Sequence, residues 1–433
     1  MSLGRAMNAA VSGMGANSTR MNIIGDNIAN SNTVGFKRSR GVFGDMVSQS
    51  LIGATATFSQ IGGGVRLIDV QQVHSQGALG YTGLDTDMGI SGSGYFMING
   101  TINGQTGNFY TRAGQFHLDE NGFLVTPQEM RLQGYGVTSD GQINGSLGDI
   151  NLTASNIPPL ATEDVVFTAN LNSEDTAVVA AFDSTDPYNT SNFATAITIY
   201  DSLGNAHQLD VFFRKTAGNN WEWHGLIDGG DLTGGTSGVA TEVASGTLGF
   251  TTDGRLDTEV IVGGTINFRD ATQNQVIDFD FGPSITTDGG DGESGTTQYS
   301  ARSSINFQTQ DGYTTGSLTR FGVSEDGVIS GAYSNGEVRT VGQLTLSSFQ
   351  NPQGLHKLGQ NMWGETRDSG EPLVGVPNSG PRGSVVSQHL EQSNVDLAEE
   401  MVDMIITQRA FQANSKTVTT ADSMLAEIIQ MKR

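Results

Sequence analysis

The sequence contains no cysteine, which excludes disulfide bonds, thiolate metal sites and a cysteine nucleophile. Proline is scarce, at 9 of 433 residues, and the 59 glycines follow no three-residue period, so a collagen-like chain is excluded. No apolar run approaches the length of about 20 residues that a membrane-spanning helix needs, and the first residues lack a signal-peptide pattern. We therefore expect no membrane insertion, and a cytoplasmic chain unless export uses a route that reads no cleavable signal.

Positive charge is the next deficit, because 22 Lys and Arg residues oppose 45 Asp and Glu residues, a net charge of −23. Binders of nucleic acid or of anionic membranes need a basic surface, so both classes are excluded. The imbalance is uneven: residues 151–300 hold 21 acidic and 4 basic residues, whereas residues 1–44 hold five basic residues and one acidic residue. With about 150 residues per domain, the chain is expected to form roughly three domains, the middle one acidic and solvated.

Both ends of the chain carry a heptad pattern, in which apolar residues recur at alternating spacings of four and three. The N-terminal seam is Leu3, Met7, Ala10, Met14, Met21, Ile24 and Ile28; the C-terminal seam is Leu397, Met401, Met404, Phe411, Val418, Leu425 and Ile429. Each pattern predicts a helix of about 30 residues, roughly 45 Å long. One narrow stripe buries little in an isolated chain, so these helices are expected to pair with each other and with further copies. A capping box at Ser393 and Asp396, or Asn394 alone, is expected to start the second helix.

Between the helices the pattern is that of β-hairpins. Short alternating segments flank Asn121-Gly122, Asp253-Gly254 and Asp326-Gly327, which supply the positive φ that tight hairpin turns require. The fold class is therefore predicted to be α+β, with terminal helices paired as a coiled coil and two mainly antiparallel β domains inserted between them. The predicted division is a helical domain of residues 1–30 and 393–433, a connecting segment 31–75, a middle β domain 76–157 and 305–392, and an outer acidic β domain 158–304.

No pattern argues for catalysis. The six histidines have no metal-ligand spacing, and no nucleophile elbow accompanies a His and Asp pair, so no catalytic residue, metal or cofactor is predicted. The acidic loop 288–293 has the composition of a calcium site without the EF-hand ligand order, which leaves a solvated loop as the better interpretation. The basic run Lys37, Arg38 and Arg40 is expected to be solvated or to pair with acidic groups of a neighbouring copy.

The residues that follow the N-terminal seam carry a longer motif. Residues 27–37 resemble the signature of bacterial flagellar rod and hook proteins, a motif whose residues here are Ala29, Asn30, Asn32, Thr33, Gly35, Phe36 and Lys37. Residues 393–401 with 408–414 are similar to the closing signature of the same family, and residues 84–96 resemble its shared strand segment. The acidic β-patterned insertion favours the longer members of this family over the shorter rod proteins.

The resemblance implies a structural role. It implies a homopolymer of many copies, with paired terminal helices inside and the acidic domain outside, located in the bacterial flagellum. It also implies type III export, for which Phe43 and Val47 match a short export-gate pattern, and contact with rod proteins, junction proteins and a cap. The competing classes are an acidic calcium-binding adhesin, which would bind a ligand as a monomer, and a β-rich glycan-active enzyme, which would need a carboxylate pair in a cleft.

Overall fold

A computed structural model of the chain describes all residues except 1, 47–48, 51–59, 103, 139–140, 153–155 and 432–433. The chain divides into two units. The first unit is formed by Met1–Ser155, Arg320–Ala332 and Val338–Arg433, and the second by Asn156–Thr319 and Tyr333–Glu337. The chain thus leaves the first unit, forms the second, and returns.

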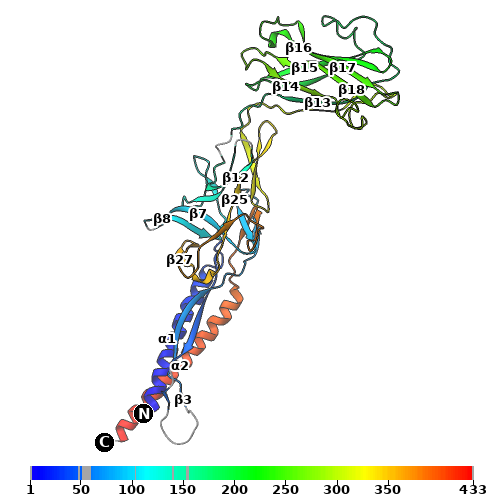
Figure 1. Cartoon of the computed structure of the whole chain (residues 1–433). Coiled ribbons are helices and arrows are strands. Elements are labelled where there is room, and N and C mark those ends of the chain that lie inside the picture. The colour runs from blue at the N-terminus through cyan, green and yellow to red at the C-terminus, as the bar shows by residue number, and fades with distance from the viewer. Residues whose placement is uncertain are drawn as a thin grey trace. The chain divides into compact units, whose positions relative to one another are not determined.

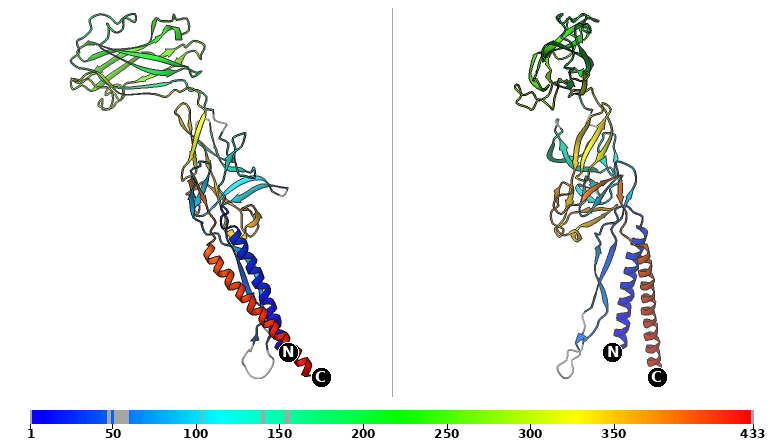
Figure 2. Two further views of the ribbon diagram at one scale, coloured as in Figure 1. Left: turned by 180° about the vertical axis from the view of Figure 1, so that it is seen from behind. Right: turned by 90° about the vertical axis from the view of Figure 1, so that its right-hand side faces the viewer.

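The two predicted terminal helices are confirmed. Helix α1 spans Ser2–Ala29 and helix α2 spans Leu397–Met431, and the two lie side by side in the first unit (Figures 1 and 2). Neither helix contains a proline. Within the residues that the structure describes, no helix is apolar enough over its length to cross a membrane.

The first unit holds most of the strands. Its strands before the second unit are β1 (Ser39–Asp45), β2 (Gln49–Ser50), β3 (Gln60–Ile61), β4 (Val65–Gln72), β5 (Leu79–Tyr81), β6 (Met88–Ser91), β7 (Tyr95–Ile102), β8 (Gln105–Thr111), β9 (His117–Leu118), β10 (Leu124–Val125), β11 (Arg131–Val137) and β12 (Ile143–Asp149). After it come β23 (Leu318–Val323), whose first two residues belong to the second unit, and β24 (Val328–Tyr333), whose last residue does. The remaining strands are β25 (Val338–Leu344), β26 (Leu346–Ser348), β27 (His356–Gly359), β28 (Met362–Gly364), β29 (Leu373–Gly375), β30 (Ser384–Ser387) and β31 (His389–Glu391).

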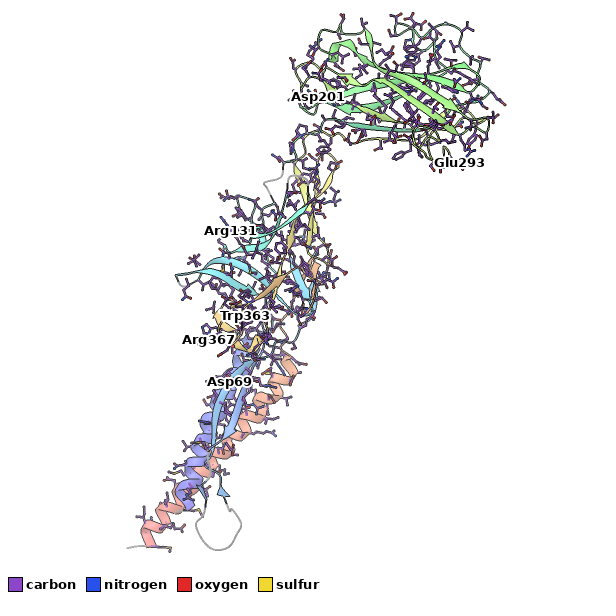
Figure 3. The ribbon with its side chains drawn as sticks, viewed as in Figure 1. Asp69, Arg131, Asp201, Glu293, Trp363 and Arg367 are labelled. Carbon is purple, nitrogen blue, oxygen red and sulfur yellow. The ribbon has the colours of Figure 1, made fainter. Side chains whose placement is uncertain are left out.

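One large antiparallel sheet organises the first unit, in the order β23-β24-β25-β11-β7-β8-β28-β27. Strands from both halves of the chain pair directly in it, as where Gly134 of β11 is registered to Leu344 of β25. Strands of this sheet contribute a cluster of buried aromatic side chains. In it the ring of Trp363 on β28, labelled in Figure 3, lies 5.5 Å from the ring of Tyr95 on β7. The separate ribbon β1-β4 packs against α1.

The second unit is built from two larger sheets and the two-stranded ribbon β19-β20 around one core. Its strands are β13 (Asp164–Asn170), β14 (Phe193–Tyr200), β15 (Ala206–Ala217), β16 (Asn220–Asp228), β17 (Ala240–Phe250), β18 (Leu256–Gly263), β19 (Thr265–Ile266), β20 (Gln275–Val276), β21 (Asp278–Asp280) and β22 (Ser304–Gln310). Strands β14 to β18 form an antiparallel sheet in chain order, and β21-β13-β22 form a second sheet in which β13 and β21 are parallel.

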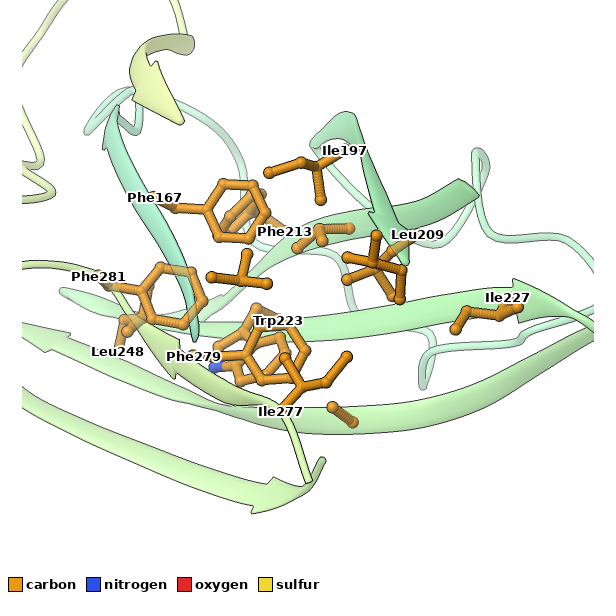
Figure 4. Close-up of a cluster of buried hydrophobic side chains, with 14 of the residues drawn as sticks. Phe167, Ile197, Leu209, Phe213, Trp223, Ile227, Leu248, Ile277, Phe279 and Phe281 are labelled. Carbon is orange, nitrogen blue, oxygen red and sulfur yellow. The ribbon is translucent and has the colours of Figure 1, made fainter. Parts of the chain in front are cut away.

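The core of the second unit follows from strand periodicity. Trp221 and Trp223 are two residues apart on β16, so both point into the same core. The ring of Trp223 lies 5.0 Å from the rings of Phe279 and Phe281, which come from β21 and the residue after it (Figure 4). All four side chains are buried, so an acidic segment still contains a full apolar core.

The predicted hairpin turns are confirmed. Gly122, Gly254 and Gly327 all have φ between 76° and 87°, and they lie between β9 and β10, β17 and β18, and β23 and β24. Residues 305–319, which the sequence analysis groups with the middle domain, lie in the second unit, because β22 pairs with β13. The finer division into four domains stays a proposal.

Candidate functional site

The motif of residues 29–37 lies where α1 ends and the strands of the first unit begin. The backbone N–H of Asn30 donates to the carbonyl of Asp26, 3.1 Å away, and the Asn30 side chain donates to the same carbonyl at 2.9 Å. The Asn30 side-chain oxygen accepts from the Thr33 hydroxyl at 3.2 Å. Asn30 therefore satisfies a carbonyl of the last helical turn and shapes the turn that follows. Ala29 and Asn32 are exposed.

Gly35 and Phe36 turn the chain inward. Gly35 has φ +69°, and a Cβ atom there would lie 2.6 Å from the backbone nitrogen of Ala113, so only glycine fits. Its N–H donates to the backbone carbonyl of Glu391, 2.7 Å away, and Phe36 is buried next to it. The motif thus brings the N-terminal segment onto the last strand before α2.

Lys37 is at the centre of a buried charge cluster. Its Nζ lies 2.5 Å from Oε1 of Glu391 and 2.8 Å from the carbonyl of Ser75. The other carboxylate oxygen of Glu391 accepts from Arg112 at 3.1 Å, and the N–H of Gly77 donates to Oε1 at 2.8 Å. The side chains of Lys37 and Glu391 are 1% and 0% exposed. Burial lowers the pKa of Lys37, and the negative charge of Glu391 opposes this shift. One carboxylate is thus paired with two cations that are both removed from water.

The cluster corrects one prediction. The basic run was expected to be solvated or to pair with a neighbouring copy, yet Lys37 pairs with Glu391 of its own chain, and Arg38 pairs with Glu399 at 2.9 Å. Arg40, the third residue of the run, is exposed as expected. The two partners are more than 350 residues from their cations along the sequence. No local pattern reveals such a pair.

His74 borders the same cluster and is kept neutral. Burial first, and then the charges of Lys37 and Arg112, lower the pKa of His74 from 6.5 to about 4. Its Nδ1 lies 2.8 Å from the hydroxyl of Tyr95, whose pKa burial raises to about 12. A proton on His74 would add a third positive charge beside a single carboxylate.

Asn27 ties both helices to the connecting segment. Its Nδ2 donates to the carbonyl of Ser39 at 2.9 Å and to Glu400 of α2 at 3.0 Å, and its Oδ1 accepts from the N–H of Ser39 at 2.8 Å. Burial raises the pKa of Glu400. Asn394 adds a further link, accepting from the N–H of Arg38 at 2.8 Å. The start of α2, the end of α1 and the connecting segment therefore form one hydrogen-bonded junction.

The predicted cap of α2 is corrected by this geometry. The Oδ1 of Asp396 accepts from the N–H groups of Ala398 and Glu399, at 2.8 and 3.2 Å, so Asp396 is the N-cap. Ser393 accepts instead from the N–H of Val395, before the helix begins.

The N-terminal seam lies on a covered side of α1. Ala10 and Ile24 are buried, and Met7, Met14, Met21 and Ile28 are half-buried. The side chain of Leu3 is outside the described residues. Gly13 is closely approached by α2, since a Cβ there would lie 2.8 Å from the side chain of Asn414.

The residues of the C-terminal seam differ in how much of each side chain is exposed. Met404, Val418 and Leu425 are half-buried, whereas Leu397, Met401, Phe411 and Ile429 are 38 to 68% exposed. The residues of α2 that are buried within the chain are Glu400, Thr407 and Ala421, and Asp403 pairs with Arg20 of α1 at 3.0 Å. The sequence reasoning missed this polar face. The sequence signal for this face was a seven-residue spacing that joins Glu400, Thr407, Asn414 and Ala421.

The export-gate pattern and the acidic loop 288–293 are the two remaining predicted features. Phe43 of the export-gate pattern is half-buried in β1, and Val47 lies outside the described residues. In the acidic loop, Asp288 accepts from the N–H and hydroxyl of Ser284, and Asp291 accepts from the N–H groups of Glu293 and Ser294. These carboxylates shape turns, and in the described part of the chain no three acidic, His or Cys side chains are arranged to hold a metal.

Comparison with known proteins gives four family matches along the chain. They are the flagellar basal body rod protein at residues 7–37, the flagellar hook protein FlgE/F/G D1 domain at 89–170, the flagellar basal body protein FlaE D2 domain at 170–313, and the flagellar basal body rod FlgEFG protein C-terminal region at 386–431. Among full-length relatives, the flagellar hook protein FlgE of Salmonella typhimurium is 34% identical over 429 residues, covering 98% of this chain and 99% of its own. The chain belongs to the flagellar hook protein family.

Other members of the hook protein family agree with this. The flagellar hook protein FlgE of Treponema pallidum is 34% identical over 472 residues, covering 99% of this chain and all of its own. A crystal structure of Helicobacter pylori flagellar hook protein FlgE2 covers 72% of this chain with a TM-score of 0.51 at 17% identity, which shows a shared fold.

The two terminal matches of this hook family chain meet at the buried charge cluster. The N-terminal match ends at Lys37 and the C-terminal match includes Glu391, so their ion pair joins the two ends of the chain. The arrangement holds distant segments of the chain together and leaves an apolar face of α2 exposed.

Proposed function

We propose that this chain is the structural subunit of a bacterial flagellar hook, located in the hook of the basal body. Many copies polymerise into a curved, flexible tube that transmits motor torque to the filament and encloses the export channel. The observation that carries this function is the end-to-end relationship to hook proteins at 34% identity. The hook protein family is structural rather than enzymatic.

The middle of the chain favours a hook subunit over a distal rod subunit. A D2-domain match covers residues 170–313, and the second unit has its own aromatic core. A calcium-binding adhesin is disfavoured, because the carboxylates of the loop 288–293 are engaged in turns.

In the assembled tube, α1 and α2 pair as a coiled coil and form the inner wall. The seam residues Met401, Phe411 and Ile429 contact further copies, and this contact buries apolar side chains that are exposed in the single chain. The four-part division places the connecting segment 31–75 next to the helices, then the middle β domain, and the acidic domain 158–304 outermost.

The chain reaches its site through the flagellar type III export apparatus, with Phe43 and Val47 presented to the export gate. Rod proteins, hook-filament junction proteins and the hook cap are its further partners.

Electron microscopy of the purified full chain tests the function. Tubes of constant diameter that curve are the expected product. A protein that stays dispersed at every concentration and salt condition tried, while its β units are folded, would reject the proposal.

A further inference from the structure

A cavity of about 260 Å³ lies in the first unit next to the motif segment and has no part in the proposed function above. Its lining comes from the motif, the large sheet and two turns: Thr33, Val34, Ile98, Thr111, Ala113, Gln115, Thr126, Pro127, Gln128, Gln360, Asn361 and Met362. No charged residue is among them.

The cavity has an apolar floor and an amide rim. Ile98 and Met362 are buried at the floor, whereas Gln115, Gln128 and Gln360 are exposed. In the part of the chain that the structure describes, the side chains of these three glutamines make no hydrogen bond. Each carboxamide offers both a donor and an acceptor, which is the combination that pairs with a peptide backbone.

A strained turn fixes one side of the rim. Gln360 and Asn361 both have positive φ, 52° and 58°, between β27 and β28. The Asn361 side chain donates to the carbonyl of Val34 at 2.7 Å, and the Thr111 hydroxyl donates to the Asn361 carbonyl at 2.9 Å. The structure therefore holds this turn, and Gln360 with it, against the motif segment.

Strand β12 has the complementary properties. Its residues 143–148 are uncharged, and Ile143 and Leu147 are 40% and 43% exposed. Among the described strands β12 pairs only with β11, so its other edge has unpaired backbone groups. Its ladder to β11, with Leu147 registered to Tyr135, keeps it from moving into the cavity of its own chain.

Charge selects the occupant. Residues 151–300 hold 21 acidic and 4 basic residues, so most of the excess negative charge lies outside the first unit, and uncharged surfaces of two first units can meet without charge repulsion. The cavity lining and residues 143–148 of β12 are both uncharged. We propose that β12 of one copy docks into the cavity of a second copy, with Leu147 over the apolar floor and the glutamine amides paired with the free edge of the strand. This inference rests on the proposed function, since it needs a polymer.

The contact is heterologous, because the cavity and β12 are different surfaces of the same molecule. Such contacts propagate from copy to copy instead of closing into a symmetric dimer. The contact therefore joins the β-strand regions of the first units of two copies and is separate from the helical inner wall.

The absence of native cysteine makes the test direct. A full-length double variant, Gln128→Cys with Leu147→Cys, is polymerised under the conditions that give wild-type tubes, oxidised, and analysed by denaturing electrophoresis without reductant. A ladder of dimers, trimers and longer species is expected. A mixture of the two single variants should stop at dimers, because each copy then has one thiol.

The matched control is Gln105→Cys with Leu147→Cys. Gln105 is an exposed glutamine on β8, six residues from Thr111 and so about 20 Å from the cavity. At least a fivefold excess of ladder over this control supports the inference. Tubes without that excess overturn the inference alone, whereas a wild-type chain that forms no tubes overturns the proposed function. Gln128→Trp, which covers the rim, is expected to slow polymerisation at least tenfold relative to Gln105→Trp, and equal rates contradict the contact.

Discussion

Glu391 shows how one side chain can join distant parts of a chain. It is fully buried, accepts from Lys37, Arg112 and Gly77, and its backbone carbonyl accepts from Gly35. Its carboxylate balances one of two buried positive charges. Removing that carboxylate would leave both cations desolvated without an opposite charge.

Glu391→Gln is therefore expected to lower the free energy of unfolding of the first unit by about 3 to 5 kcal/mol. The measurement is denaturant-dependent hydrogen exchange of residues 88–111, which reports on the first unit separately from the second. Glu399→Gln is the control, because Glu399 pairs with Arg38 at the surface with its side chain 59% exposed. That change should cost less than about 1 kcal/mol. Equal effects of the two variants would show that the buried cluster does not stabilise the junction.

His74 predicts a pH dependence of the same unit. Its pKa is lowered from 6.5 to about 4, so the unfolded chain binds the proton more readily than the folded chain does. The stability that neutral His74 provides is complete above pH 6.5 and is lost as the pH falls toward 4. The loss amounts to roughly 3 kcal/mol.

His74→Gln is expected to remove this slope between pH 6.5 and 4, because glutamine does not titrate and keeps a hydrogen-bonding group for Tyr95. Free energies of unfolding at several pH values in that range measure it. His117→Gln, at a half-exposed histidine, should leave the slope as it is in the wild type. An unchanged slope in His74→Gln would contradict the assignment.

At the scale of elements, α2 has more than one role. Its buried residues within the chain are Glu400, Thr407 and Ala421, and much of its apolar surface, including Val402, Ile405 and Ile406, stays exposed. A helix that needed only to pack on α1 would not require these exposed apolar side chains. The helical pair is therefore suited to bury more surface when copies assemble.

Met404→Asp and Phe411→Asp are each expected to block tube formation while both β units stay folded. An aspartate at either position would have to be buried without a partner in the assembled wall. Sedimentation of polymer and circular dichroism of the monomer measure the two parts of the prediction. Gln412→Asp, an exposed polar position on the same helix, should polymerise normally. Normal tubes from either seam variant would remove the helical seam from the assembly mechanism.

At the scale of the whole molecule, the second unit is inserted through a narrow connection. Leu160 and Tyr313 exchange two backbone hydrogen bonds of 3.0 Å, and an Ile157 to Gly316 bridge follows the same two chain segments. Because entry and exit are paired there, the unit can be removed across that bridge with little disturbance of the first unit.

Deletion of residues 161–312, closed by Asn-Gly between Leu160 and Tyr313, is expected to leave tube formation intact and to change tube curvature or bending stiffness. The helices and strands of the first unit keep all their residues, whereas most of the acidic second unit is removed. Electron microscopy of polymers measures curvature, and fluctuation of tube shape measures stiffness. Tubes with both properties unchanged would show that the second unit has no mechanical role.

Single residues show which features of the fold could be predicted from the sequence. The terminal helices and the hairpins at Gly122, Gly254 and Gly327 follow from local rules of periodicity and backbone conformation, and the structure contains them. Lys37 was assigned to the right motif and to the wrong environment. Nothing near it in sequence shows that its partner is Glu391.

The sequence by itself determined the secondary structure of the ends, the turn chemistry and the family, because each depends on short segments whose residues act together. The tertiary structure alone decided which polar groups are buried, since Asn27 with Glu400 and Lys37 with Glu391 meet only after the chain returns from the second unit. It also decided which face of α2 is left for other copies, because two heptad faces of similar spacing compete and only packing against α1 selects between them.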